Sequence, residues 1–167
     1  MGMLGGNPVM YIDPMGLSKL TIFQDGKVIS LDNPTATQLV NTLKNLPNSS
    51  VTNFQIAGHG NNFSQCISAG TGCSDFINEN LNIVGSGKRL GNLADLLKDK
   101  LSSNGEVNLE GCNNASGGDN ITKRLSDVLP EVPVTGGDGY QLGYENHWLF
   151  GNSASSFGFK RTYLNGQ

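Results

Sequence analysis

The stretch Val107–Asn114, VNLEGCNN, decides how the rest of the chain is interpreted. Val107 and Leu109 flank a polar residue, the alternation expected of a half-buried strand. Gly111 and Cys112 follow at the point where this strand runs out into a polar, glycine-containing loop. A thiol at a strand end, beside a glycine, is open to substrate, which is a common arrangement for a nucleophilic cysteine. The stretch therefore predicts a strand that delivers Cys112 to a site.

A second strand end of the same construction comes earlier in the chain. The segment Thr52–Ala57 predicts a strand, and it runs directly into Gly58, His59 and Gly60. Active residues of open α/β sheets gather beyond the carboxyl ends of the strands. We therefore predict that His59 lies beside Cys112 and serves as its base.

Strand-like and helix-like segments alternate over most of the chain. The helical spacing of leucines is clearest in three segments, 33–47, 93–101 and 119–129. The strand-like segments are Lys19–Phe23, Val28–Leu31, Thr52–Ala57, Glu106–Leu109 and Val132–Thr135. This order favours an α/β fold with a central, largely parallel sheet flanked by helices and with β-hairpin additions.

Several boundaries are predicted from local signals. Asn33 should cap the first helix, Asn104-Gly105 should end the second, and Asp119 or Asn120 should cap the third. On the third helix, Ile121, Leu125, Val128 and Leu129 should face the core. Segment 61–87 has a poor pattern and is interpreted as an irregular insertion or a β-ribbon beside the site, and 157–163 alternates like a terminal strand.

Composition limits the functions that the chain can have. Its 167 residues suit one domain with a real core. A net charge of −3 gives no electrostatic footprint for nucleic acid. No apolar run is long enough to span a membrane, and the first ten residues are too polar for a signal peptide. The GSGKRLG segment at 85–91 lacks the order of a phosphate-binding loop.

The cysteines and histidines allow more than one arrangement. Cys66 and Cys73 can form a disulfide, although reduced thiols in a cytosolic setting are the simpler default. Zinc ligation by the three cysteines with His59 and His147 is an alternative, but the short spacings of such sites are absent. His147, which precedes Trp148, is the alternative candidate if His59 is not the base. We expect no metal and no organic cofactor.

Residues 7–17, NPVMYIDPMGL, resemble the end of the Rhs/YD-repeat core, which has the pattern PxxxxDPxGL. The matching residues are Pro8, Asp13, Pro14, Gly16 and Leu17. In that family the core shell cuts its own chain after the final leucine and releases a variable C-terminal toxin. The resemblance implies that 1–17 are the tail of an Rhs core and that 18–167 are the toxin domain. Asp13 is then a recognition residue, because the cutting residues belong to the shell.

The two strand ends resemble those of the caspase-like (clan CD) cysteine peptidases. Members of this family have an apolar strand that ends in His-Gly. A later apolar strand ends in Gln or Glu, then Ala or Gly, then Cys. The counterparts in this chain are FQIAGHG (54–60) and VNLEGC (107–112). His59 and Cys112 are 53 residues apart, close to the roughly 50 of caspases. The resemblance implies that His59 is the general base, Cys112 the nucleophile, Gly60 an oxyanion donor and Glu110 a liner of the P1 pocket. Gly111 stands where caspases have alanine.

Together these resemblances imply a secreted toxin, a type VI secretion effector, that acts as a cysteine endopeptidase. It would be delivered into the cytoplasm of a bacterial or host target cell and cleave a protein there. The Rhs resemblance implies two partners, the core shell before release and a cognate immunity protein. Two alternatives stay open: an Rhs-associated nuclease, or a binding module without enzymatic activity.

Overall fold

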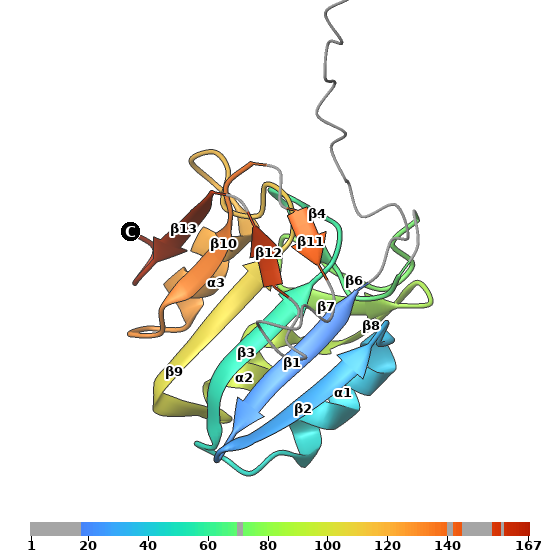
Figure 1. Cartoon of the computed structure of the whole chain (residues 1–167), viewed down its shortest axis with the longest axis vertical. Coiled ribbons are helices and arrows are strands. Elements are labelled where there is room, and N and C mark those ends of the chain that lie inside the picture. The colour runs from blue at the N-terminus through green and yellow to red at the C-terminus, as the bar shows by residue number, and fades with distance from the viewer. Residues whose placement is uncertain (1–17, 70–71, 140–141, 145–154, 158) are drawn as a thin grey trace, which may run out of the picture.

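The fold was analysed on a computed structural model that describes residues 18–69, 72–139, 142–144, 155–157 and 159–167. The Rhs-like motif residues and His147 lie outside this part of the chain. A six-stranded sheet forms the centre of the molecule (Figure 1). Its strand order is β13 (Lys160–Tyr163), β10 (Val134–Gly137), β9 (Leu101–Glu110), β3 (Val51–Ala57), β1 (Lys19–Gln24) and β2 (Lys27–Asp32).

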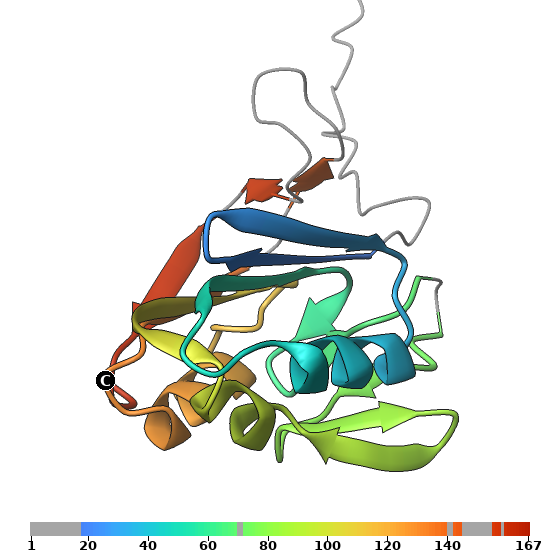
Figure 2. The same cartoon turned by 90° about the horizontal axis from the view of Figure 1, so that it is seen from below.

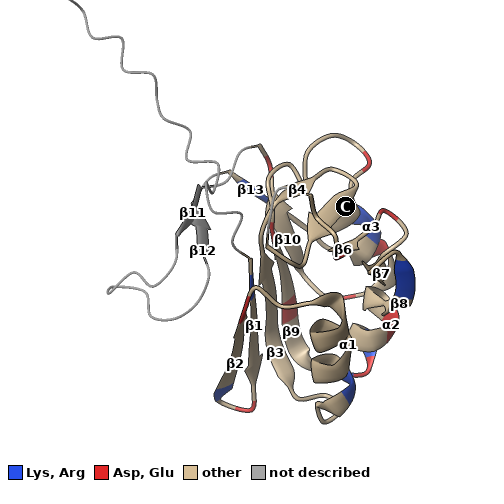
Figure 3. Ribbon diagram, turned by 90° about the vertical axis from the view of Figure 1, so that its right-hand side faces the viewer, with Lys and Arg blue, Asp and Glu red and all other residues tan. Residues whose placement is uncertain are grey.

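The helices in the described part of the chain all cover one face of this sheet (Figures 2 and 3). They are α1 (Ala36–Asn45), α2 (Leu93–Lys98) and α3 (Ile121–Val128). The pairings make β2, β3, β9 and β10 run in one direction, and the chain steps through them in one direction across the sheet. Right-handed crossovers that all step the same way lie on the same face. The fold is therefore one-sided rather than flanked by helices on both faces.

A small antiparallel sheet forms part of the crossover between β3 and β9. It consists of β4 (Gly60–Asn61), β5 (Ser64–Cys66), β6 (Phe76–Ile77), β7 (Asn82–Gly85) and β8 (Lys88–Asn92). Segment 61–87 is thus a β-ribbon, the second of the two expectations. A further hairpin, β11 (Leu142–Tyr144) with β12 (Ser155–Phe157), lies on the sheet face opposite the helices (Figures 1 and 2).

One apolar core joins the two sheets. Leu20, Phe54 and Leu109 of the large sheet are buried together with side chains of all three helices. The ribbon contributes Ile67, Ile77 and Ile83, each 0% exposed, to the same cluster. None of the helices among the described residues is long and apolar enough to cross a membrane.

The α/β class is confirmed, but the sheet is mixed rather than largely parallel. Of its five strand pairings, β3–β9 and β9–β10 are parallel and the other three are antiparallel. The β1–β2 hairpin accounts for part of the difference. It turns at Asp25 and Gly26, both with positive φ (47° and 75°), as the Asp-Gly signal predicts.

The first helix begins later than predicted. Its N-cap is Thr35, which forms a capping box with Gln38. Asn33 instead has a positive φ of 47°, and its side chain accepts a hydrogen bond from the Ser18 amide at 2.8 Å. The third helix is capped by Asn120, one of the two predicted residues. The prediction that Val128 faces the core is wrong, because this residue is 52% exposed at the end of the helix.

The second helix is shorter and the following strand longer than predicted. α2 ends at Lys98, and β9 already begins at Leu101. Leu101 pairs with Val51, so tertiary pairing overrides the helical spacing of the leucines. The Asn104-Gly105 signal falls inside β9, where the pairing with β3 shifts register. The predicted helix stop is thus an irregularity of a strand.

Candidate functional site

The strand ends that carry His59 and Cys112 are neighbours. β3 and β9 pair in parallel, and the last paired residues are Ala57 and Glu110. His59 and Cys112 each lie two residues beyond this pair. Both residues therefore leave the same edge of the sheet from adjacent strands, and both are half-buried.

The segments that follow β3 and β9, which carry His59 and Cys112 and are called the His59 loop and the Cys112 loop, are in tight contact. This contact confirms that the two strand ends are close together. A Cβ added at Gly60 would lie 3.0 Å from the Cα of Gly111 and would collide with the side-chain amide of Asn114. A side chain at position 60 would therefore force the Asn114 amide, and with it the Gly111 backbone, to shift.

The end of β10 supports the Cys112 loop from the other side. The amide of Asn113 donates to the carbonyl of Gly139 at 2.7 Å, and that of Ala115 to Gly137 at 2.8 Å. Asn113 itself has a positive φ of 59°. Three neighbouring parallel strand ends thus converge on the loop that carries Cys112.

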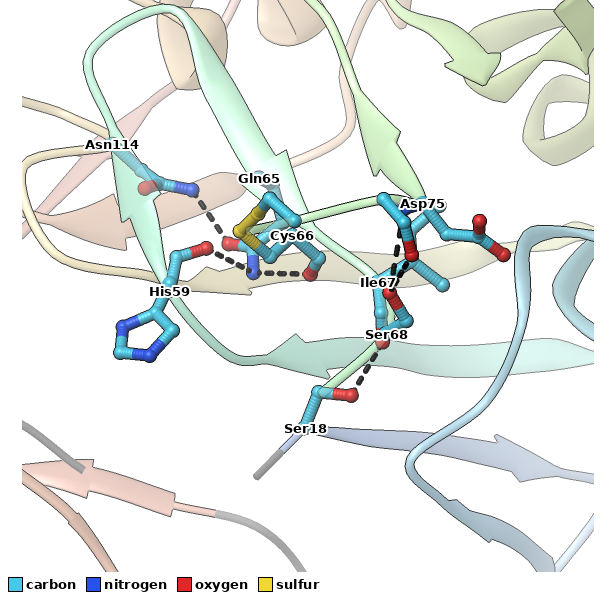
Figure 4. Close-up of a disulfide and its surroundings, with 10 residues drawn as sticks. Ser18, His59, Gln65, Cys66, Ile67, Ser68, Asp75 and Asn114 are labelled. Carbon is cyan, nitrogen blue, oxygen red and sulfur yellow. Dashed lines mark hydrogen bonds between the residues drawn. A yellow bond between two sulfur atoms is a disulfide. The ribbon is translucent and has the colours of Figure 1, made fainter. Parts of the chain in front are cut away.

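The main chain of His59 is held by the ribbon. Its carbonyl accepts a hydrogen bond from the amide of Cys66 at 2.8 Å. Figure 4 shows the imidazole pointing away from Gln65 and from the disulfide. The ring is therefore not used to bind the ribbon.

Glu110 lies in an ion pair. The carboxylate is buried, with 7% of the residue exposed, and both oxygens accept from the ammonium of Lys160 on β13 at 2.9 Å. A basic P1 side chain would have to displace Lys160 to reach this carboxylate. Sequence reasoning missed Lys160, because a β13 residue 50 positions away leaves no local signal.

Cys66 and Cys73 form a disulfide next to the His59 loop, in place of the reduced pair taken as the default (Figure 4). Their sulfurs are therefore bonded to each other rather than placed to ligate zinc. Within the described part of the chain, no group of three or more His, Cys, Asp or Glu residues could hold a metal ion.

Charged side chains around the site are paired on the surface. Arg161 contacts Asp138, at 2.6 Å, and its pKa is raised, first by a hydrogen bond with the Tyr163 hydroxyl and also by Asp138. Asp119, which precedes α3, accepts a hydrogen bond from Arg124 on that helix. This bond lowers the pKa of Asp119 and raises the pKa of Arg124.

Two buried amide residues in the site were not found from the sequence. Gln65 on β5 and Asn114, two residues after Cys112, join the two loops by a side-chain hydrogen bond of 2.6 Å. The only sequence signal was that Asn114 belongs to the same GCNN stretch as Cys112. No family model, curated protein or solved structure matches this chain.

Proposed function

We propose that the protein is a cysteine endopeptidase with His59 and Cys112 as its catalytic dyad. The observation that carries the proposal is the register of β3 and β9, which places both residues two positions beyond one pair of neighbouring strand ends. A thiol needs a nearby base because it is mostly protonated at neutral pH. This edge of the sheet supplies an imidazole on the adjacent strand.

The proposed reaction follows from the roles of these groups. The proton of the Cys112 thiol passes to His59, and the sulfur attacks the scissile carbonyl carbon. The backbone amides of Gly60 and Cys112 are the proposed donors to the oxyanion. As the C–N bond breaks, His59 returns the proton to the leaving amine, and a thioester remains on Cys112. Water then hydrolyses the thioester to release the acid and the thiol.

The caspase-like resemblance agrees with some features of the structure and differs from others. In its favour are the parallel pair β3–β9, the strand-end positions of His59 and Cys112, and glycine beside each of them. The one-sided arrangement of helices and the paired Glu110 differ from what the resemblance implies. We therefore propose the dyad without assigning a P1 preference to Glu110.

We further propose that residues 18–167 act as the released toxin of an Rhs-type effector inside a target cell. Ser18 already belongs to the folded body: the residue is 2% exposed, its amide donates to Asn33, and its hydroxyl donates to the carbonyl of Ile67 (Figure 4). This supports a toxin domain that includes Ser18. A cognate immunity protein and the core shell remain the proposed partners.

The test compares the wild-type chain with Cys112→Ala and His59→Ala after incubation in a bacterial lysate. New protein N-termini are identified by mass spectrometry. We expect a small set of termini with a common P1 type in the wild type, absent with Cys112→Ala and reduced at least about a hundredfold with His59→Ala. Identical termini in all three samples would overturn the proposed peptidase activity.

A nuclease is distinguished in the same experiment. Activity on added DNA or RNA that survives thiol alkylation but is lost with a chelator would identify that alternative. A peptidase should respond in the opposite way, because its nucleophile is the thiol.

A further inference from the structure

A chain of buried hydrogen bonds connects the Cys112 loop with the His59 loop (Figure 4). Gln65 and Asn114 are both 0% exposed. The Nδ2 of Asn114 donates to Oε1 of Gln65 at 2.6 Å. The Nε2 of Gln65 donates to the carbonyl of Cys66 at 2.9 Å and, with a longer contact of 3.4 Å, to that of His59.

The partners determine how both amides are oriented. Carbonyl oxygens only accept, so the amino group of Gln65 must face Cys66 and His59. Its oxygen then faces Asn114, which has to donate. The remaining oxygen, Oδ1 of Asn114, is directed to Gly60 and Gly111 and has no hydrogen-bond partner among the described residues.

A buried acceptor without a partner is unfavourable and needs an explanation. Here the oxygen is wedged between the two strand ends. A Cβ added at Gly111 would lie 2.5 Å from this oxygen and 2.6 Å from Oε1 of Gln65, and a Cβ at Gly60 would collide with the same amide. The amide pair thus occupies the space that an alanine would need at position 111.

Both ends of the amide pair are anchored outside the loops. The carbonyl of Asn114 accepts from the hydroxyl of Thr122 in the first turn of α3 at 2.9 Å. Gln65 stands beside Cys66, which is held by the disulfide to Cys73. A displacement of one loop relative to the other would therefore break buried hydrogen bonds.

We propose that Gln65 and Asn114 are positioning residues that fix the His59 strand end relative to Cys112. This inference rests on the proposed dyad and assigns neither residue a contact with substrate. Because rates of proton transfer depend steeply on placement, loss of the pair should weaken the help that His59 gives to Cys112.

The test is a double-mutant cycle that uses the full chain and iodoacetamide as the probe. The alkylation rate of Cys112 is measured at pH 7 by mass spectrometry, without reductant, so that the disulfide persists. The variants are Asn114→Ala, His59→Ala and the two combined. We expect each single variant to slow alkylation, His59→Ala by at least roughly tenfold, Asn114→Ala by about three- to tenfold.

The combination decides between positioning and a merely structural effect. If Asn114 acts through His59, Asn114→Ala changes the rate less than about twofold once His59 is absent. Independent, multiplicative effects would overturn the proposal. A rate in Asn114→Ala equal to the wild type would also overturn it while leaving the dyad standing. No effect of His59→Ala would remove the dyad and the positioning role together.

Asn108→Ala is the matched control. Asn108 on β9 donates to Asn53 on β3 at 3.2 Å, so this amide pair joins the two strands that precede Cys112 and His59, away from their ends. Its loss should leave the alkylation rate at the wild-type value. If Asn114→Ala does not fold, Gln65→Met, which keeps the length but not the hydrogen bonds, enters the same cycle.

Discussion

Gly111, next to Cys112, lies in closely packed surroundings. The oxygens of Asn114 and Gln65 both lie within 2.6 Å of where its Cβ would be. We expect Gly111→Ala to lower the free energy of unfolding by about 1–3 kcal/mol, since the amide pair must shift. We also expect slower alkylation of Cys112.

Gly118→Ala provides the control in the same loop, because a Cβ there would meet nothing within 4 Å. Urea unfolding gives the stability of both variants, and iodoacetamide gives the reactivity of Cys112. Equal results for the two variants would contradict the close packing around Gly111.

At the scale of elements, α1 is capped by the ribbon as well as by its own sequence. The carboxylate of Asp75, 9% exposed, accepts a hydrogen bond from the amide of Ala36 at 2.6 Å. An acidic group at a helix N-terminus binds otherwise unpaired amides and interacts favourably with the helix dipole.

We expect Asp75→Ala to destabilise the protein by about 1–2 kcal/mol, as for loss of a helix cap. Urea unfolding measures the loss. Asp95→Ala is the control, because Asp95 pairs with Lys98 on the exposed surface of α2, where such pairs contribute little. A loss in Asp95→Ala as large as in Asp75→Ala would mean that burial at α1 is not the cause.

At the scale of the whole molecule, the ribbon and the large sheet share one core, so they should unfold together. Ile67 and Ile83 of the ribbon belong to the same cluster as Phe54 and Leu109 of the sheet. The Cys66–Cys73 disulfide should therefore stabilise the entire fold, although it closes a loop only within the ribbon.

We expect reductant to lower the free energy of unfolding of the Cys112→Ala variant by about 2 kcal/mol, given the short loop that the disulfide closes. The thermal midpoint should fall by roughly 4–8 °C. Circular dichroism and hydrogen exchange in β9 should report one coincident transition. A variant with serine at both 66 and 73 should not respond to reductant; separate transitions would contradict the shared core.

Local signals in the sequence determined the elements whose partners are close in the chain. The Asp25-Gly26 turn, the Asn120 cap and the strand that precedes His59 follow from backbone preferences and side-chain periodicity. The sequence by itself also determined that His59 and Cys112 each follow a strand and a glycine, which was enough to predict that they meet at one sheet edge.

Only the tertiary structure decided what depends on partners distant in the chain. Leu101 lies in a strand because it pairs with Val51. Glu110 forms an ion pair because β13 places Lys160 beside it. The hydrogen bond between Gln65 and Asn114 joins residues that are 49 positions apart, so no local sequence pattern predicts it. The physical reason is the same in each case: periodicity reports which face of an element is buried, whereas the identity of the contacting residue depends on how the whole chain packs.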